Sequence, residues 1–287
     1  MSAQDPTKVI AMLNEDIRGE HAAIVQYLRH AYAMEEGELA CEIEAIARDE
    51  MRHLDWLAET VAELGGEPDL ERGQMTIGGD SISEWMQRDV GLEKDAIALY
   101  EQHIEAIEDR KIKRLLRRIV SDEVAHRHDF EHFVVKSKKK AMEPIAPLEA
   151  PAGKPSKLGD MLNWGIRHEY TVILQYLYHS FMTPDEEVSE QMDDQAINEM
   201  QHLGWLAEEL TGAGGVPDME ETGVDRSKDT ADMLRADIAV EREVTKEYTR
   251  QIDEVDDPDL KRLITRIRDN EIYHDELFSD LLDEVSE

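Results

Sequence analysis

Four copies of a Glu-x-x-His motif, spread along the whole chain, constrain the fold of this 287-residue protein more than any other feature. Each copy is preceded, 30 residues earlier, by a further glutamate. Glutamate and histidine three residues apart share one face of an α-helix, so each motif can present an oxygen and a nitrogen ligand together. One such motif arises easily in an acidic helix, whereas four matched sets indicate a repeated metal-binding unit. The sets are Glu20 with Glu50 and His53, Glu93 with Glu123 and His126, Glu169 with Glu199 and His202, and Glu241 with Glu271 and His274.

The constant spacing has a geometric cause. A helix break lies midway between the two glutamates of each set, at residues 35–37, 108–110, 183–185 and 256–258. Each glutamate is then about 15 residues from the turn, roughly 22 Å along its helix, and the two arms of a hairpin bring their glutamates to the same height. Two facing hairpins gather four glutamates and two histidines in one core, as in di-metal carboxylate bundles. The sequence therefore predicts an all-α protein of two four-helix bundles.

The first bundle is expected to hold helices at about 7–34, 38–64, 81–107 and 110–136, with Ser81 as a cap. Residues 65–80 carry several glycines and are too long for a tight hairpin, so they are predicted to cross over along the bundle. Residues 137–156 begin with a solvated lysine run, Lys138–Lys140, and continue rich in Pro and Ala. This composition indicates a semi-extended linker.

After the linker the chain repeats itself, which indicates a tandem duplication. NEDIRGEHAAIVQYLRH at 14–30 returns as NWGIRHEYTVILQYLYH at 163–179, and EMRHLDWLAETVAELGGEPDL at 50–70 returns as EMQHLGWLAEELTGAGGVPDM at 199–219. The offset is 149 residues in the first hairpin and 148 in the second. The expected domains are residues 1–136 and 157–287.

Charge and cysteine content narrow the possible partners. With 66 acidic and 32 basic residues the net charge is −34, which argues against nucleic acid or an anionic membrane as the partner. The chain has no run of 18 apolar residues and no apolar N-terminal signal segment, so a soluble, cytoplasmic protein is expected. The single cysteine, Cys41, excludes an intrachain disulfide and cysteine-ligated iron–sulfur or zinc sites.

Several stretches resemble the bacterioferritin branch of the ferritin-like superfamily, among them EHAAIVQYLRH, DEMRHLDWLAETVAELGGEPDL, MTIGGDSISEWMQRDVGLE and SDEVAH. The resemblance covers nearly all of each half and implies four-helix bundles with non-haem di-iron centres. It implies that Glu50 and Glu123 bridge two metals while Glu20 and Glu93 bind terminally, with His53 and His126 as nitrogen ligands. In the second half, Glu199 and Glu271 would bridge, with Glu169, Glu241, His202 and His274 as the remaining ligands.

A tyrosine follows each terminal glutamate by seven residues, which is two helical turns and therefore the same face. The tyrosines are Tyr27, Tyr100, Tyr176 and Tyr248. For Tyr27 and Tyr176 the resemblance implies a hydrogen bond to a ligand carboxylate and a catalytic role as an electron donor. For Tyr100 and Tyr248 a site role and simple core packing both stay open.

The two halves differ immediately before each Glu-x-x-His. The first half has Asp49 and Asp122, where the second has Asn198 and Asn270. Di-iron carboxylate proteins commonly carry an aspartate here that accepts the imidazole N–H, and losing such a partner can cost roughly 10–100-fold in metal affinity. We therefore expect the first site to hold metal more tightly than the second.

Met51 and Met200 directly follow bridging glutamates. Bacterioferritins use a methionine here to bind a haem shared between two subunits, so the resemblance allows haem b between the two domains. Methionine on a helix flank more often packs, and the same motif occurs in ferritin-like proteins without haem.

The ligand set suits Fe²⁺, with Mn²⁺ as an alternative. We expect Fe²⁺ oxidation by O₂ or H₂O₂, that is, a ferroxidase with two di-iron centres per chain. The alternatives are iron storage in a shell, a peroxide-scavenging enzyme similar to rubrerythrin or manganese catalase, and a non-catalytic iron-binding protein. Shells of this family use a short fifth helix, which is missing after His274, so a pseudo-dimer within the chain or a small homo-oligomer is expected rather than a cage.

Overall fold

The computed structural model describes residues 4–149 and 156–286, and within these ranges the only regular secondary structure is α-helix. The first unit contains α1 (Pro6–Tyr32), α2 (Glu38–Glu63), α3 (Ile82–Ala106) and α4 (Arg110–Lys140). The second contains α5 (Lys157–Met182), α6 (Glu186–Gly212), α7 (Thr230–Glu254) and α8 (Pro258–Ser286). The all-α prediction and the helix breaks are therefore confirmed.

The helix starts follow from their capping residues. Asp5 accepts a hydrogen bond from the N–H of Thr7 with Pro6 as the first helical residue, and Ser81 accepts one from the N–H of Glu84. Asp109 accepts from two N–H groups at the start of α4. At the end of α2, Gly65 adopts a φ of 76°, a conformation that favours glycine and ends the helix.

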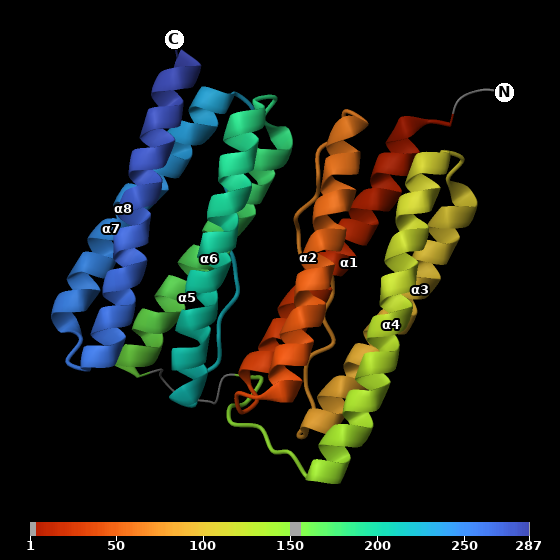
Figure 1. The fold of residues 1–287 in the computed structure, drawn as a ribbon, viewed down its shortest axis with the longest axis horizontal. Helices are drawn as coiled ribbons and strands as arrows, with labels where there is room; N and C mark the ends of the chain where they lie inside the picture. The colour runs from red at the N-terminus through yellow and green to blue at the C-terminus, as the bar shows by residue number, and fades with distance from the viewer. Residues whose placement is uncertain (1–3, 150–155, 287) are drawn as a thin grey trace. The chain divides into compact units, whose positions relative to one another are not determined.

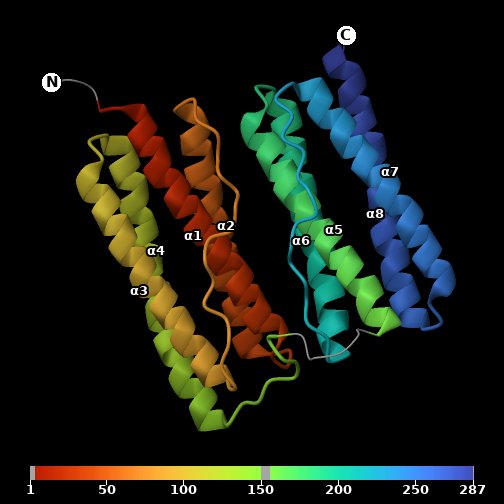
Figure 2. The same cartoon turned by 180° about the vertical axis from the view of Figure 1, so that it is seen from behind.

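Each unit is a bundle of two antiparallel helix pairs (Figures 1 and 2). In the first unit α1 packs along α2 and α3 along α4, with further contacts between α1 and α3 and between α2 and α4. The second unit repeats this arrangement with α5 to α8. The segment between α2 and α3 runs the length of the bundle, so that α3 is parallel to α2 (Figure 2). This is the predicted crossover, and it places the second hairpin against the first.

The predicted linker at 137–156 is wrong over its first part. Helix α4 continues through the lysine run to Lys140 and ends at Ala141 in a left-handed conformation. Lysines in a last helical turn are favourable because they face the negative end of the helix dipole. Beyond it, the N–H of Ile145 donates to the carbonyl of Ala33, and Leu148 is buried. The chain up to residue 149 therefore belongs to the first bundle, and predicted linker residues 150–155 lie outside the described ranges.

The core of each bundle is apolar above and below a central polar layer. In the first bundle one buried cluster includes Tyr27, Ile43, Trp85 and Phe130, and in the second the corresponding cluster includes Tyr176 and Phe278. No helix in the described ranges combines the length and apolar character needed to cross a membrane. Cys41 is an exposed residue of α2.

Candidate metal centres

All twelve predicted ligands lie in the central polar layers, six in each bundle. In the first bundle two groups of side chains converge so that one oxygen or nitrogen from each member lies within 4.8 Å of the others. One group is Glu20, Glu50, His53 and Glu123, and the other is Glu50, Glu93, Glu123 and His126. The groups share Glu50 and Glu123, whereas Glu20 and Glu93 each belong to one. The shared carboxylates therefore occupy the positions from which a side chain can reach two ions.

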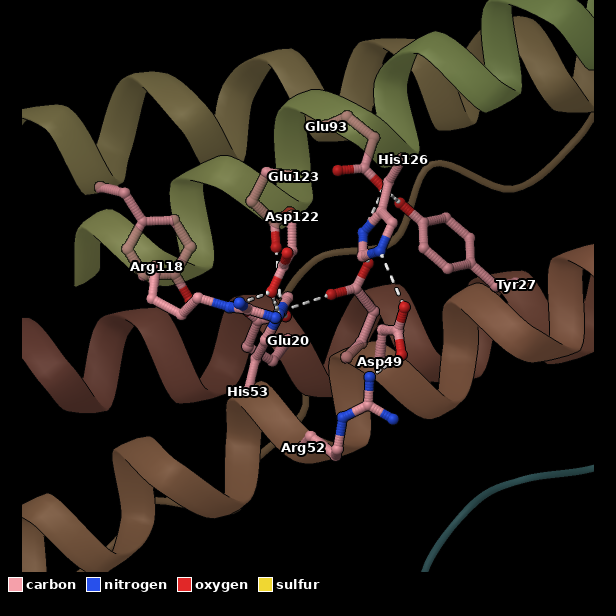
Figure 3. A network of polar contacts seen from close by, with 12 residues as sticks. Glu20, Tyr27, Asp49, Arg52, His53, Glu93, Arg118, Asp122, Glu123 and His126 are labelled. Carbon is pink, nitrogen blue, oxygen red and sulfur yellow. Dashed lines mark hydrogen bonds and ion pairs between the residues drawn. The ribbon is translucent and has the colours of Figure 1, made fainter. Parts of the chain in front are cut away.

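In the first bundle the imidazole rings of His53 and His126 lie near each other, with their centroids 5.9 Å apart (Figure 3). The Nδ1 atom of His53 lies 2.8 Å from Oε2 of Glu50 and 2.9 Å from Oε1 of Glu123. The Nδ1 atom of His126 lies 3.0 Å from Oε1 of Glu50. The two oxygens of Glu50 are thus divided between the two histidines.

The second bundle repeats this geometry. Its groups are Glu169, Glu199, His202 and Glu271, and Glu199, Glu241, Glu271 and His274. The Nδ1 atom of His202 lies 2.7 Å from Oε2 of Glu199, and that of His274 lies 2.8 Å from Oε1. The side chain of Glu199 therefore lies between both imidazoles, as Glu50 does in the first bundle.

The donor set fits divalent cations because its atoms are buried and in part unpaired. Every member of both sets is at most 4% exposed. Within the described residues, eight buried ligand atoms make no hydrogen bond of good geometry, although six of them face a histidine or glutamate of the same centre at 2.8–3.1 Å. The eight atoms belong to Glu50, Glu93, Glu123, His126, Glu199, Glu241, Glu271 and His274. Burying a carboxylate oxygen without a partner is costly, and a bound cation removes that cost.

Burial and mutual repulsion shift the pKa values of these groups strongly. Burial, reinforced by Glu93 and Glu20, raises the pKa of Glu50 to about 7. Burial raises the pKa of Glu93 and Glu241 well above the usual carboxyl value. Burial alone would lower the pKa of His126, but the neighbouring Glu50 raises it to about 9. In the absence of a cation, the cluster holds protons in its place.

All four tyrosines donate a hydrogen bond to the terminal glutamate of the opposite hairpin. The hydroxyl of Tyr27 lies 2.5 Å from Oε1 of Glu93. The hydroxyl groups of Tyr100, Tyr176 and Tyr248 donate in the same way to Glu20, Glu241 and Glu169, respectively. The expected contacts of Tyr27 and Tyr176 are present, and Tyr100 and Tyr248 make contacts of the same kind. A functional role for these tyrosines stays a prediction.

The aspartates before the Glu-x-x-His motifs contact the histidine of the other hairpin. Oδ2 of Asp49 lies 3.3 Å from Nε2 of His126, and Oδ2 of Asp122 lies 3.6 Å from Nε2 of His53. Arginine side chains bind both aspartates, Arg52 at Asp49 and Arg118 at Asp122 (Figure 3). The imidazole rings of the first bundle are thus held from outside by charged carboxylates.

The second bundle replaces these carboxylates with neutral amides. Nδ2 of Asn270 lies 3.0 Å from Nε2 of His202. The amide of Asn198 instead donates to the carbonyl of Asp194 and to Gln195 on its own helix. Arg266, which corresponds to Arg118, stacks over the ring of Trp205 at 4.3 Å. The side chains that surround the imidazoles therefore differ chemically between the two bundles.

Met51 and Met200 are both partly exposed on α2 and α6. Haem binding at these residues stays a prediction.

Buried Asp–His pairs lie one helical turn from the terminal glutamates and were not predicted from the sequence. Asp16 pairs with His103, Asp89 with His30, and Asp237 with His179. The signal was present in the sequence, because each aspartate stands four residues before a terminal glutamate and each histidine ten residues after one.

Comparison with known proteins identifies the family. The family model for the ferritin-like domain matches residues 10–139 and again residues 159–287. The chain therefore belongs to the ferritin-like family and carries two ferritin-like domains in tandem.

Similar proteins match about half of this chain at a time. The bacterioferritin of Desulfovibrio desulfuricans is 32% identical over 158 residues, which are 53% of this chain and 87% of that protein. The bacterioferritin of Streptomyces coelicolor is 32% identical over 129 residues, 43% of this chain and 77% of its own. An X-ray structure of the D. desulfuricans protein, described by its di-iron site in different catalytic states, covers 53% of this chain and 94% of its own, with 32% identity and a TM-score of 0.46.

Replacing Glu93 with glutamine should stabilise the metal-free protein at high pH. Because the pKa of Glu93 is raised on folding, the folded state holds a proton that the unfolded chain releases, and stability falls as the pH rises toward the folded pKa. Glu93→Gln removes this loss. We expect the melting temperature of the apo-protein to rise by roughly 3–6 °C at about pH 9 and to stay unchanged at about pH 5, measured by calorimetry.

The matched control is Glu101→Gln, an exposed position on the same helix, which should change the melting temperature at neither pH. A Glu93→Gln variant that melts below the parent at about pH 9 would contradict the stated origin of the shift.

Proposed function

We propose that each bundle binds two iron ions and that the protein oxidises Fe²⁺ with O₂ or H₂O₂ at two di-iron centres per chain. The observation that carries the proposal is the buried convergence of four glutamates and two histidines in each bundle, with ligand atoms left unpaired by the protein. Hard carboxylate oxygens with one imidazole per ion suit Fe²⁺, and Mn²⁺ is the alternative metal. The bacterioferritin relatives support iron as the metal.

At each centre some residues would bridge the two ions and others would bind a single ion. Glu50 and Glu123 would bridge two ions in the first bundle, and Glu199 and Glu271 in the second. Glu20 and Glu93, or Glu169 and Glu241, would each bind one ion, and each histidine would bind through Nδ1. A pair of ferrous ions held there would supply two electrons to a bound oxidant.

The tyrosines would hold the terminal carboxylates in position. A hydroxyl hydrogen bonded to one oxygen fixes the rotation of the carboxylate and leaves its other oxygen free for an ion. Tyr27 and Tyr176 would also donate an electron, a role supported by the hydrogen bond of each phenol to a candidate ligand, Glu93 or Glu241. Storage in a shell, peroxide scavenging and plain iron buffering would need the same ligands. The following experiment separates storage and buffering from Fe²⁺ oxidation.

Stepwise aerobic addition of Fe²⁺ to the apo-protein should give rapid oxidation that stops at about four irons per chain, two for each centre. Ferric absorbance, soluble iron and particle size are recorded together. Glu50→Ala should halve the number of irons oxidised in the rapid phase, and adding Glu199→Ala should abolish the rapid phase. Hundreds of soluble irons in a large particle would instead indicate storage, and tight metal retention without oxidation would indicate buffering.

Replacing the first-bundle aspartates with asparagine should make its centre behave like the second. Asp49→Asn with Asp122→Asn removes both carboxylates that hold the outer imidazole nitrogens, so metal affinity of the first centre should fall roughly 10–100-fold. Affinity is measured with Mn²⁺ by magnetic resonance, in full-length chains whose other centre is disabled by Glu199→Ala and Glu271→Ala.

The reciprocal change, Asn270→Asp, should raise the affinity of the second centre in chains disabled at Glu50 and Glu123. Equal affinities of the two unmodified centres would show that the substitution of asparagine for aspartate has no functional weight.

A further inference from the structure

Three buried Asp–His pairs lie one helical turn from the terminal glutamates, outside the ligand sets. Within a bundle the two hairpins are related by approximate symmetry, so each bundle has two such positions, one beside each terminal glutamate. The first bundle fills both, with Asp16–His103 beside Glu20 and Asp89–His30 beside Glu93. The second fills only the position beside Glu241, with Asp237–His179.

In the first bundle one pair reaches the surface. Nδ1 of His103 lies 2.9 Å from Oδ1 of Asp16, and its Nε2 lies 3.6 Å from Oε2 of Glu15. The side chain of Asp16 is fully buried, that of His103 is 8% exposed, and that of Glu15 is 55% exposed. Asp16 and Glu20 are four residues apart and therefore adjacent on one face of α1. Polar side chains thus follow one another from the candidate centre to solvent.

The second bundle has a similar line of polar side chains that leads to the surface, but it lies beside Glu241, at the position where the first bundle has Glu93. Nδ1 of His179 lies 3.0 Å from Oδ2 of Asp237, and its Nε2 lies 3.3 Å from Oδ1 of Asp225. The imidazole and Asp237 are fully buried, whereas the side chain of Asp225 is 39% exposed. Asp225 lies in the crossover segment, and its backbone N–H donates to Gln175, which in turn donates to Asp237.

At the two remaining positions, beside Glu93 and Glu169, no such line of polar groups reaches the surface among the described residues. At the crossover position of Asp225 the first bundle has Thr76, whose N–H donates to Gln26 in the same way. Among the described residues, Nε2 of His30 has no hydrogen-bond partner, and the ring stacks on Trp85 at 5.5 Å. In the second bundle Gly165 replaces Asp16, and a Cβ atom there would lie 2.8 Å from a methyl group of Leu206, so that a side chain at this position would require Leu206 to move.

The geometry of these lines suits protons better than metal ions. In each line the two carboxylates face opposite nitrogens of one imidazole ring, so they cannot close around a single cation. Neither line belongs to the side-chain groups whose ligand atoms converge. An imidazole that accepts at one nitrogen and donates from the other is the standard unit for passing a proton between two carboxylates.

We propose that Asp16–His103–Glu15 and Asp237–His179–Asp225 are the proton routes of the two centres, one for each bundle and at opposite terminal glutamates. The proposal rests on the function proposed above, since Fe²⁺ oxidation followed by hydrolysis of Fe³⁺ by water, and metal binding itself, release protons inside a buried cluster.

Each transfer moves one proton and returns the groups to their starting state. A proton released at the centre protonates Asp16, which passes it to Nδ1 of His103 while the Nε2–H proton moves to Glu15 and then to water. Rotation or tautomer exchange of the ring restores His103. Burial raises the pKa of Asp16 to about 6, against the opposing effect of His103, so this carboxyl can hold a proton near neutral pH. The charged groups that act on Asp16 are His103, Glu20 and Glu15.

The test follows proton release in full-length chains whose second centre is disabled by Glu199→Ala and Glu271→Ala. Stopped-flow mixing with a pH indicator dye is run twice, with Zn²⁺ without oxygen and with Fe²⁺ in air. His103→Gln copies Gln251 of the second bundle, and Glu15→Gln changes only an exposed side chain. Both should slow proton release at least about tenfold with either metal and increase the solvent isotope effect, while the number of metals bound stays the same.

His30→Gln is the matched control, because its pair ends inside the protein, and it should release protons at the parent rate. Thr76→Asp added to His103→Gln should restore fast release, since it gives His30 the surface carboxylate that His179 has in the second bundle.

The outcomes separate the two proposals. Parent-like proton release with Zn²⁺ in both His103→Gln and Glu15→Gln overturns the proton route even if Fe²⁺ oxidation is rapid. Slowed release with Zn²⁺ in a chain that never oxidises Fe²⁺ supports the route and overturns the ferroxidase. A parent chain that binds neither metal overturns both.

Discussion

The fold depends on burying four carboxylates and two imidazoles at the centre of each bundle. Carboxylates this deeply buried repel one another and lose hydration, and a protein without a cation can carry them only by holding protons, as the raised pKa values of Glu50 and Glu93 indicate. The buried apolar cluster next to this layer in each bundle supplies stability that offsets the cost of burying the polar groups. The 30-residue spacing then follows, because only hairpin arms of equal length bring the ligands to one height.

The two bundles keep the ligands and the four tyrosine contacts but differ in what surrounds them. In the first bundle Asp49 and Asp122 face the outer nitrogens of both imidazoles, whereas in the second only the amide of Asn270 contacts one of them, that of His202. The buried Asp–His pairs also differ, so that each bundle has one line of polar groups to the surface, at opposite terminal glutamates. We therefore propose that the duplicated chain carries two centres with one ligand set but different metal affinities and proton exits.

Most of the fold and all the candidate ligands could be predicted from the sequence, because helical periodicity and fixed spacing are local properties. The cross-hairpin partners could not be. That Tyr27 reaches Glu93 rather than Glu20 depends on how the hairpins dock, and the same holds for Asp16 and His103, which are 87 residues apart. The end of α4 could not be predicted because the composition of the lysine run is typical of a linker, whereas in the structure the run forms the last turn of the helix and Leu148 is buried.

The central claim is that each bundle forms one dinuclear metal centre from its own six ligands. Anaerobic titration of the full-length apo-protein with Co²⁺, followed by absorption and calorimetry, tests it most directly. We predict about four ions per chain, with magnetic coupling within each pair, and about two ions after Glu50→Ala and Glu123→Ala. One uncoupled ion per bundle, or binding that survives these substitutions unchanged, would contradict the account.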